Sequence, residues 1–270
     1  MSGPDQWDER TIANGRWLRA DFGALSLLVM NIHDEWRIAA FPDGAPANVG
    51  LHGRAADLAE DIEWERWERH SDDCRLRFRP TFPSLPVIAR PRSLLHISPG
   101  GQANFFVGIS ASIEVLAECH GAMVSLLAVP TERLSKTWHG TPLAGSLGFA
   151  LKTYARRTFE PDEWPAYDIV CSISIVNDGS ESLPFERLYL ETQHLGVFQK
   201  DGRLWSNAAR LRVKVQEHNL SNITYASRPA APYEDAAELT PPPEGRLRRS
   251  TLHSAFARVL GHLNPLGDPP

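Results

Sequence analysis

Apolar and polar residues alternate in several short stretches of the chain, as expected for strands that have one face on a core. The stretch 210–215 alternates Leu and Val with Arg and Lys, and the stretch 75–79 alternates Arg with Leu and Phe. Two further apolar stretches, Leu25–Ile32 and Glu35–Phe41, predict strands near the N-terminus. The pattern therefore indicates half-buried β-strands along most of the chain.

Ile169–Val176 is apolar or small on both faces, which predicts a central strand rather than an edge strand. Asn177–Ser180 follows as a turn, because Asn, Asp and Gly tolerate the left-handed backbone that turns need. Leu183–Leu190 then resumes as a strand. The three segments together predict a β-hairpin.

Phe105–Leu116 is another apolar run, and it follows a turn at Ile97–Gly101. Residues 147–153 alternate, whereas 62–67 is ambiguous between strand and helix. About ten strands or more are expected, which exceeds the ~7 to 9 of one small sandwich. We therefore expect an all-β fold of antiparallel β-sandwich halves, immunoglobulin-like or jelly-roll-like; one large distorted sandwich is the alternative.

The expected domain organisation follows from these strands and from the Pro-rich C-terminal part. Residues 1–129 form an N-terminal β-rich half, and residues 130–225 a C-terminal β-sandwich half. Residues 226–245 are rich in Pro and Ala and predict a linker that lies across the surface. Residues 246–263 predict an amphipathic helix followed by a loose tail, 264–270; the apolar stripe of this helix is Leu252, Phe256, Val259, Leu260 and Leu263.

Composition narrows the class of protein. The chain has 270 residues and a formal net charge of −5, which disfavours nucleic-acid binding because that depends on cationic contacts to phosphate. Its three cysteines, Cys74, Cys119 and Cys171, are too few and too scattered to predict a disulfide framework or a zinc site. A polar, acidic start and short apolar runs predict a soluble, cytoplasmic protein.

Motifs of several enzyme classes are missing from the sequence. It has no phosphate-cradling G-x-x-x-x-G-K-[ST] loop, no G-x-G-x-x-G turn, no G-x-S-x-G elbow and no H-E-x-x-H helix. Kinase, dehydrogenase, α/β-hydrolase and zincin activities are therefore disfavoured, and we expect no cofactor.

One segment, Pro130–Pro142, concentrates residues that can bind a ligand. Ser135 and His139 can act on a ligand beside Trp138, and Lys136 can hold an anion. The ordinary structural interpretation is an ordered crossing between sheets, with Trp138 closing the end of a core. The sequence favours this structural interpretation, because a single Ser-Lys pair is common by chance.

Two other hypotheses use residues that are distant in sequence. A small-molecule or glycan binder needs Trp138 and Trp205 to line one concave pocket as stacking surfaces. A metal-assisted hydrolase needs His120, His139 and His194 to converge, although nothing in their spacing requires it. A non-enzymatic binding or accessory module remains the leading hypothesis, because the catalytic motifs are absent.

The predicted C-terminal helix offers a separate binding hypothesis. Its polar face is basic, so it can lie on an anionic membrane surface or in the groove of a partner. The favoured alternative is that its apolar stripe covers a sheet of its own domain. Peripheral membrane contact is thus an option that the sequence does not favour.

Several short motifs are spread along the chain: Leu85–Pro91, Ser98–Gly100, Phe105–Val107, Pro130–Thr131, Leu134–Gly140, Ala155–Arg157, Val176–Asp178 and Phe185–Leu188. Together they resemble an uncharacterised prokaryotic family, the domain-of-unknown-function 432 family, across roughly residues 20 to 225. The resemblance implies a soluble β-rich protein with no established activity, and an unknown protein partner that is a membrane protein. In the family pattern an aromatic residue follows the tryptophan, whereas here His139 follows Trp138. Arg156 and Arg157 are carried over as candidate ligand-binding residues, and the equal alternative is a structural role in which they bridge to carboxylates across sheets.

Overall fold

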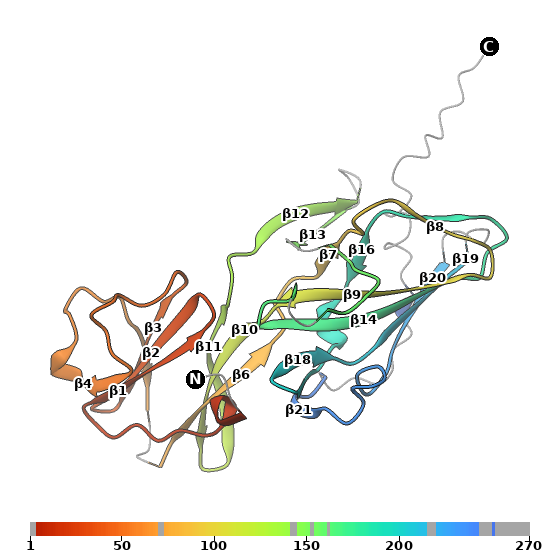
Figure 1. Cartoon of the computed structure of the whole chain (residues 1–270). Coiled ribbons are helices and arrows are strands. Elements are labelled where there is room, and N and C mark those ends of the chain that lie inside the picture. The colour runs from red at the N-terminus through yellow and green to blue at the C-terminus, as the bar shows by residue number, and fades with distance from the viewer. Residues whose placement is uncertain are drawn as a thin grey trace.

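The structure is a computed structural model that describes residues 4–69, 73–140, 145–151, 154–160, 163–214, 220–242 and 250–251. The fold is all-β, with several sheets of mostly antiparallel strands (Figure 1), which confirms the all-β, antiparallel part of the predicted fold class. Within these residues the helical elements are short 3-10 turns: η1 (Pro4–Trp7), η2 (Ala55–Asp57) and η4 (Thr192–His194). No helix among them is both long and apolar enough to cross a membrane.

The N-terminal sheet has the strand order β4-β1-β2-β3-β5 and lies at one end of the molecule (Figure 1). Strands β2 and β3 coincide with the two predicted apolar stretches. Both faces of β2 are buried: one faces the main core, and the other packs Leu28 and Met30 against Trp17 and Val49. The strands are β1 (Arg16–Phe22), β2 (Leu25–Ile32), β3 (Glu35–Phe41), β4 (His52–Arg54) and β5 (Glu65–Glu68).

A three-stranded sheet, β11-β10-β6, lies beside the N-terminal sheet (Figure 1). Leu76 and Phe78 are buried on β6, whereas Arg75, Arg77 and Arg79 alternate with them and are exposed or half-buried, so the predicted alternation is confirmed. The strands are β6 (Arg75–Thr81), β10 (Ser112–Cys119) and β11 (Ala122–Pro130).

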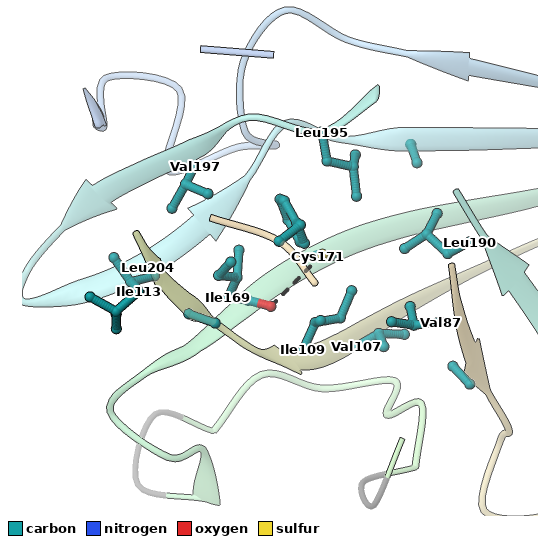
Figure 2. Packing of buried hydrophobic residues seen from close by; sticks show 14 of the residues in the cluster. Val87, Val107, Ile109, Ile113, Ile169, Cys171, Leu190, Leu195, Val197 and Leu204 are labelled. Carbon is teal, nitrogen blue, oxygen red and sulfur yellow. Dashed lines mark hydrogen bonds between the residues drawn. The ribbon is translucent and has the colours of Figure 1, made fainter. Parts of the chain in front are cut away.

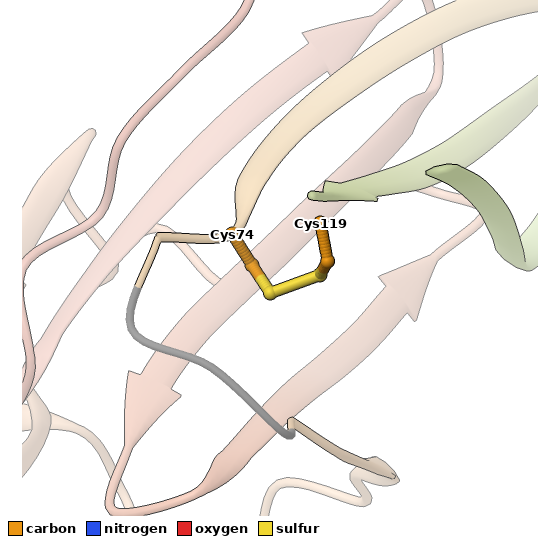
Figure 3. The surroundings of a disulfide bond; sticks show 2 residues. All are labelled: Cys74 and Cys119. Carbon is orange, nitrogen blue, oxygen red and sulfur yellow. A yellow bond between two sulfur atoms is a disulfide. The ribbon is translucent and has the colours of Figure 1, made fainter. Parts of the chain in front are cut away.

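A disulfide joins Cys74 to Cys119 at one end of this sheet (Figure 3), where the sequence predicted no disulfide framework. In the β6–β10 pair, Arg75 lies opposite Glu118. Because the two strands are antiparallel, Cys74, which precedes Arg75, lies opposite Cys119, which follows Glu118. The two Cα atoms are 4.4 Å apart, although 45 positions separate the cysteines in sequence. Strand pairing, which is not visible in sequence spacing, brings the two thiols together.

The largest sheet has the order β21-β17-β18-β14-β19-β20-β22, and β9 pairs with β14. Strand β14 is central, as predicted: β9 covers one edge, and β18 and β19 pair with the other edge in parallel. The strands are β9 (Gln102–Ser110), β14 (Asp168–Asn177), β17 (Val197–Lys200), β18 (Arg203–Ser206), β19 (Ala209–Lys214), β20 (Leu220–Tyr225), β21 (Ala237–Thr240) and β22 (Ser250–Thr251).

The predicted hairpin over 169–190 is wrong, although its strands exist. Both edges of β14 are already occupied, so the chain after the turn pairs elsewhere. The amide of Asn177 helps to redirect it by donating to the carbonyls of Ile97 and Glu181. The returning segment splits into β15 (Leu183–Phe185), which pairs with β8 (Leu95–Ile97), and β16 (Leu188–Leu190), which pairs with β7 (Val87–Ala89).

The remaining sheet has the order β12-β13-β7-β16, with β12 (Ser135–Gly140) at its edge and β13 (Gly145–Ala150) beside it. Strand β13 pairs antiparallel with β12 and parallel with β7. In Figure 1 this sheet arches over β9 and β14.

Strand pairing crosses the boundary predicted between residues 129 and 130. Strands β7, β8 and β9 precede it, yet they pair with β13, β15 and β14, which follow it. The chain from β9 to β10 changes sheet at Ala111, and buried residues on both sides of that point belong to one apolar cluster (Figure 2). One continuous core therefore replaces two halves that meet at Pro130.

The C-terminal predictions meet the structure only in part. Of the predicted linker 226–245, residues 226–242 are described, and they contribute β21 and bury Ala236 against the largest sheet. Of the predicted helix 246–263, only Ser250 and Thr251 are described, and they form β22. The rest of that segment and the tail 264–270 lie outside the described residues.

Candidate functional site

Four candidate residues, Ser135, Lys136, Trp138 and His139, lie on the edge strand β12. The register with β13 places Lys136 opposite Phe149, Trp138 opposite Leu147, and His139 opposite Ser146. Because neighbours on a strand point to opposite faces, the four side chains divide between two faces of the sheet. They therefore do not form one catalytic cluster.

His139 is on the covered face. Its side chain is fully buried, and its ring stacks on Tyr189 of β16 with 5.2 Å between the centroids. A buried, stacked imidazole supports the packing of the sheet and is not accessible to a ligand from solvent. Ser135, at the start of the strand, is exposed.

The opposite face of the hairpin is open to solvent at Trp138 and Leu147, whereas Phe149 on the same face is half-buried and packs against the core. Trp138 is 52% exposed and Leu147, its partner across the strands, is 42% exposed. The indole of Trp138 lies against the backbone of Gly145, where any Cβ would overlap it. We call Lys136, Trp138, Leu147 and Phe149 the Trp138 face; it carries one cation and no carboxylate.

Trp205 lies in a different place. It is 3% exposed on β18 and stacks on Tyr233 at 3.6 Å between the centroids, with Phe159 at 4.8 Å. Because Trp138 is on another sheet, the two tryptophans do not line one pocket. The stacking site predicted from this pair is wrong.

The three candidate metal ligands do not converge. His120 is in the turn between β10 and β11, and His139 is buried on the covered face of β12. His194 is in η4, with its Nε2 3.5 Å from the carboxylate of Glu191 and its ring 5.1 Å from Tyr225. Within the described ranges no three His, Cys, Asp or Glu side chains gather as a metal site. The three-histidine site is therefore wrong.

Arg156 and Arg157 line a hollow of about 580 Å³. Arg92 and Tyr154 line it too, and sequence reasoning did not select either of them. Nothing local in the sequence could have indicated this group, because it depends on the pairing of Pro91 with Ala155. We call this hollow the arginine pocket.

Cys171 is the described cysteine outside the disulfide, and it lies in the core on β14 (Figure 2). Burial raises the pKa of its thiol to about 12. The thiol therefore remains protonated at neutral pH and does not act as a thiolate nucleophile. Burial also raises the pKa of the Tyr225 hydroxyl.

These features define an all-β protein with an exposed aromatic hairpin and a separate cationic pocket. Residues 6–260 match the family described as "Protein of unknown function (DUF432)", and the chain belongs to this family. The resemblance found in the sequence motifs is thereby confirmed. No curated protein and no solved structure matches the chain.

Proposed function

We propose that this protein is a non-enzymatic binding module that engages a protein partner through the Trp138 face. The observation that carries the proposal is the exposure of Trp138 and Leu147 side by side on a two-stranded edge. Large apolar side chains that gather at the surface mark interaction sites. Tryptophan in particular is enriched among the residues that dominate binding energy.

The position of the hairpin supports this function. Strand β12 is at the edge of its sheet, so one row of its backbone groups faces away from β13. An extended segment of a partner can pair with such an edge while its side chains contact the adjacent face. The Lys136 ammonium favours a partner that presents a carboxylate beside an apolar contact.

The class of partner and its location belong to the same proposal. The family resemblance favours a membrane protein as partner, contacted from the cytoplasm.

The finer architecture is proposed as sandwich-like: Phe22 of the N-terminal sheet contacts Phe78 of β6 edge to face, with 5.4 Å between the centroids. Contact between side chains of two different sheets is typical of immunoglobulin-like and jelly-roll-like sandwiches, in which one sheet packs on the other. Strand β22 occupies Ser250–Thr251, so the predicted C-terminal amphipathic helix remains part of the proposal only for the portion of 246–263 that follows Thr251.

Site-specific photocrosslinking tests the proposal. A photoreactive amino acid replaces Leu147 in one sample and Leu51, which is 52% exposed on the N-terminal part, in the matched control. We expect one reproducible membrane-protein adduct from position 147 and none from position 51. Trp138→Ala should reduce this adduct by about tenfold or more, since hot-spot tryptophans contribute about 2 kcal/mol or more.

Two outcomes would contradict the proposal. Equal adducts from positions 147 and 51 would show that the Trp138 face is not selective. Binding of purified protein to protein-free anionic vesicles that is lost in Trp138→Ala would assign the face to lipid instead.

A further inference from the structure

The arginine pocket lies where three chain segments meet. Ala155 donates its N–H to the carbonyl of Arg90 at 2.8 Å and so continues the parallel pairing of β13 with β7. The next residue, Arg156, exchanges two backbone hydrogen bonds with Phe106 of β9, at 2.7 and 2.9 Å. Backbone pairing thus fixes the walls of the pocket on both sides.

The size and lining of the pocket suit a small organic molecule. Its volume of about 580 Å³ falls within the range of ligand pockets, roughly 300–1,000 Å³. Leu95 and Tyr154 supply accessible apolar surface, whereas Phe105 and Ala155 also line the pocket but are buried in the core. Tyr154 is 54% exposed, so its ring is free to stack on a flat ligand.

One of the three arginines is held in place by the protein. The Arg156 guanidinium forms an ion pair with Glu163 and lies over the ring of buried Trp164, 5.0 Å from its centroid. Arg156 is therefore part of the wall, and its charge is largely balanced by Glu163.

The other two arginines are differently placed. Arg92 and Arg157 have exposed side chains, and in the described part of the chain no carboxylate forms an ion pair with either of them. Glu160 is the remaining acid of the lining, so two guanidinium groups face one carboxylate. Among the described lining residues, positive charge is therefore in excess. Guanidinium groups bind carboxylate and phosphate oxygens through paired hydrogen bonds.

We propose that the arginine pocket binds a small organic anion, with its carboxylate or phosphate held between Arg92 and Arg157 and its flat apolar body against Leu95 and Tyr154. This site is separate from the Trp138 face. It needs no chemistry from the protein beyond charge, hydrogen bonding and stacking. It adds ligand binding to a module whose proposed function is to bind a protein.

Titration of the full chain with simple probes tests the site. Benzoate and phenyl phosphate represent the two anions on a flat body, acetate and inorganic phosphate lack the ring, and benzyl alcohol lacks the charge. We expect an aromatic anion to bind saturably, with benzyl alcohol and the ring-free anions at least about tenfold weaker. Comparing benzoate with phenyl phosphate identifies the preferred anion.

Variants locate the binding within the protein. The double substitution Arg92→Gln and Arg157→Gln should lower the affinity for the aromatic anion by about tenfold or more, because it removes two charged hydrogen-bond donors. The matched control is Arg133→Gln together with Arg210→Gln, which removes the same charge from exposed arginines outside the pocket lining and should change affinity less than about twofold. Tyr154→Ala should lower the affinity for benzoate or phenyl phosphate but leave the affinity for inorganic phosphate unchanged. Thermal unfolding of each variant verifies that it is folded.

The proposal fails if none of the probes binds saturably. It also fails if the control pair lowers affinity as much as the pocket pair, since binding would then follow net charge. Neither result affects the crosslinking at Leu147, so the failure of this site and the failure of the proposed function are distinguishable.

Discussion

Trp138 and Trp205 are both strand tryptophans with a pairing partner across the ladder, yet their environments are opposite. Trp205 lies opposite Phe198 on one side and Val170 on the other, and all three pack in one apolar cluster. Trp138 lies opposite Leu147 at a sheet edge, and both side chains are exposed. The same residue type thus stabilises the fold in one region and is available for binding in the other.

The segments that flank and cover each strand explain why Trp205 is buried and Trp138 is exposed. Strand β18 is flanked by β17 and β14, and the segment containing Tyr233 lies over Trp205. Among the described strands, β12 has a paired neighbour on one side only. Whether a tryptophan stabilises the fold or remains accessible therefore depends on segments that are distant in sequence.

The largest expected effect on stability comes from replacing Trp205 by alanine, and the same substitution at Trp138 is the comparison. Trp205→Ala should lower the free energy of unfolding by about 3–5 kcal/mol, because it leaves a cavity among aromatic rings. Trp138→Ala should change it by about 0.5 kcal/mol or less, as is usual for exposed positions. Urea denaturation of the two variants measures both values, and equal losses would break the comparison.

The disulfide provides a second structural reference, at one end of the β11-β10-β6 sheet. Replacing both Cys74 and Cys119 by serine should lower the free energy of unfolding by about 2–4 kcal/mol, because a bond that closes a loop of this size restricts the unfolded chain. Adding a reductant to the wild-type protein should give the same loss. A reductant effect that persists in the double variant would show that the loss has another origin.

A smaller effect on stability is expected at Gly145, beneath Trp138. Gly145→Ala introduces a Cβ that overlaps the indole, but the exposed ring can move aside, so the cost should be about 1 kcal/mol or less. Crosslinking through the Trp138 face should nevertheless fall, because the ring is displaced. Gly50→Ala, which meets no atom within 4 Å, is the matched control and should leave crosslinking unchanged.

The smallest effect concerns an exposed ion pair and depends on pH. Hydrogen bonds from Arg66 and then Arg37 lower the pKa of Glu35 to about 2, from 4.5. Since the pKa is lower in the folded state, the stabilisation is present above pH 4.5 and is lost as the pH falls towards about 2. Glu35→Gln should remove this part of the acid dependence of the melting temperature. An identical acid profile in that variant would show that Glu35 does not contribute.

Much of the strand content could be predicted, because alternation of apolar and polar residues is a local property. Strands β2 and β3 and the outward arginines of β6 follow from it directly. The apolar character of both faces of β14 also predicted its central position, since only a covered strand can bury both faces.

Part of the binding chemistry was also visible in the sequence. The segment that contains Trp138 was selected, and so were Arg156 and Arg157, which line the arginine pocket. Their partners were not, because Arg92 is more than 60 positions away and comes close only through the pairing of Pro91 with Ala155.

The sequence by itself determined which segments are strands, which of their faces are apolar, and which family the chain resembles. Only the tertiary structure decided which strands pair, that Cys74 meets Cys119, and that Trp205 is buried while Trp138 is exposed. The physical reason is that alternation records whether one side chain meets water or core. Pairing and cover depend on contacts between segments that are far apart in the chain, and local pattern carries no record of them.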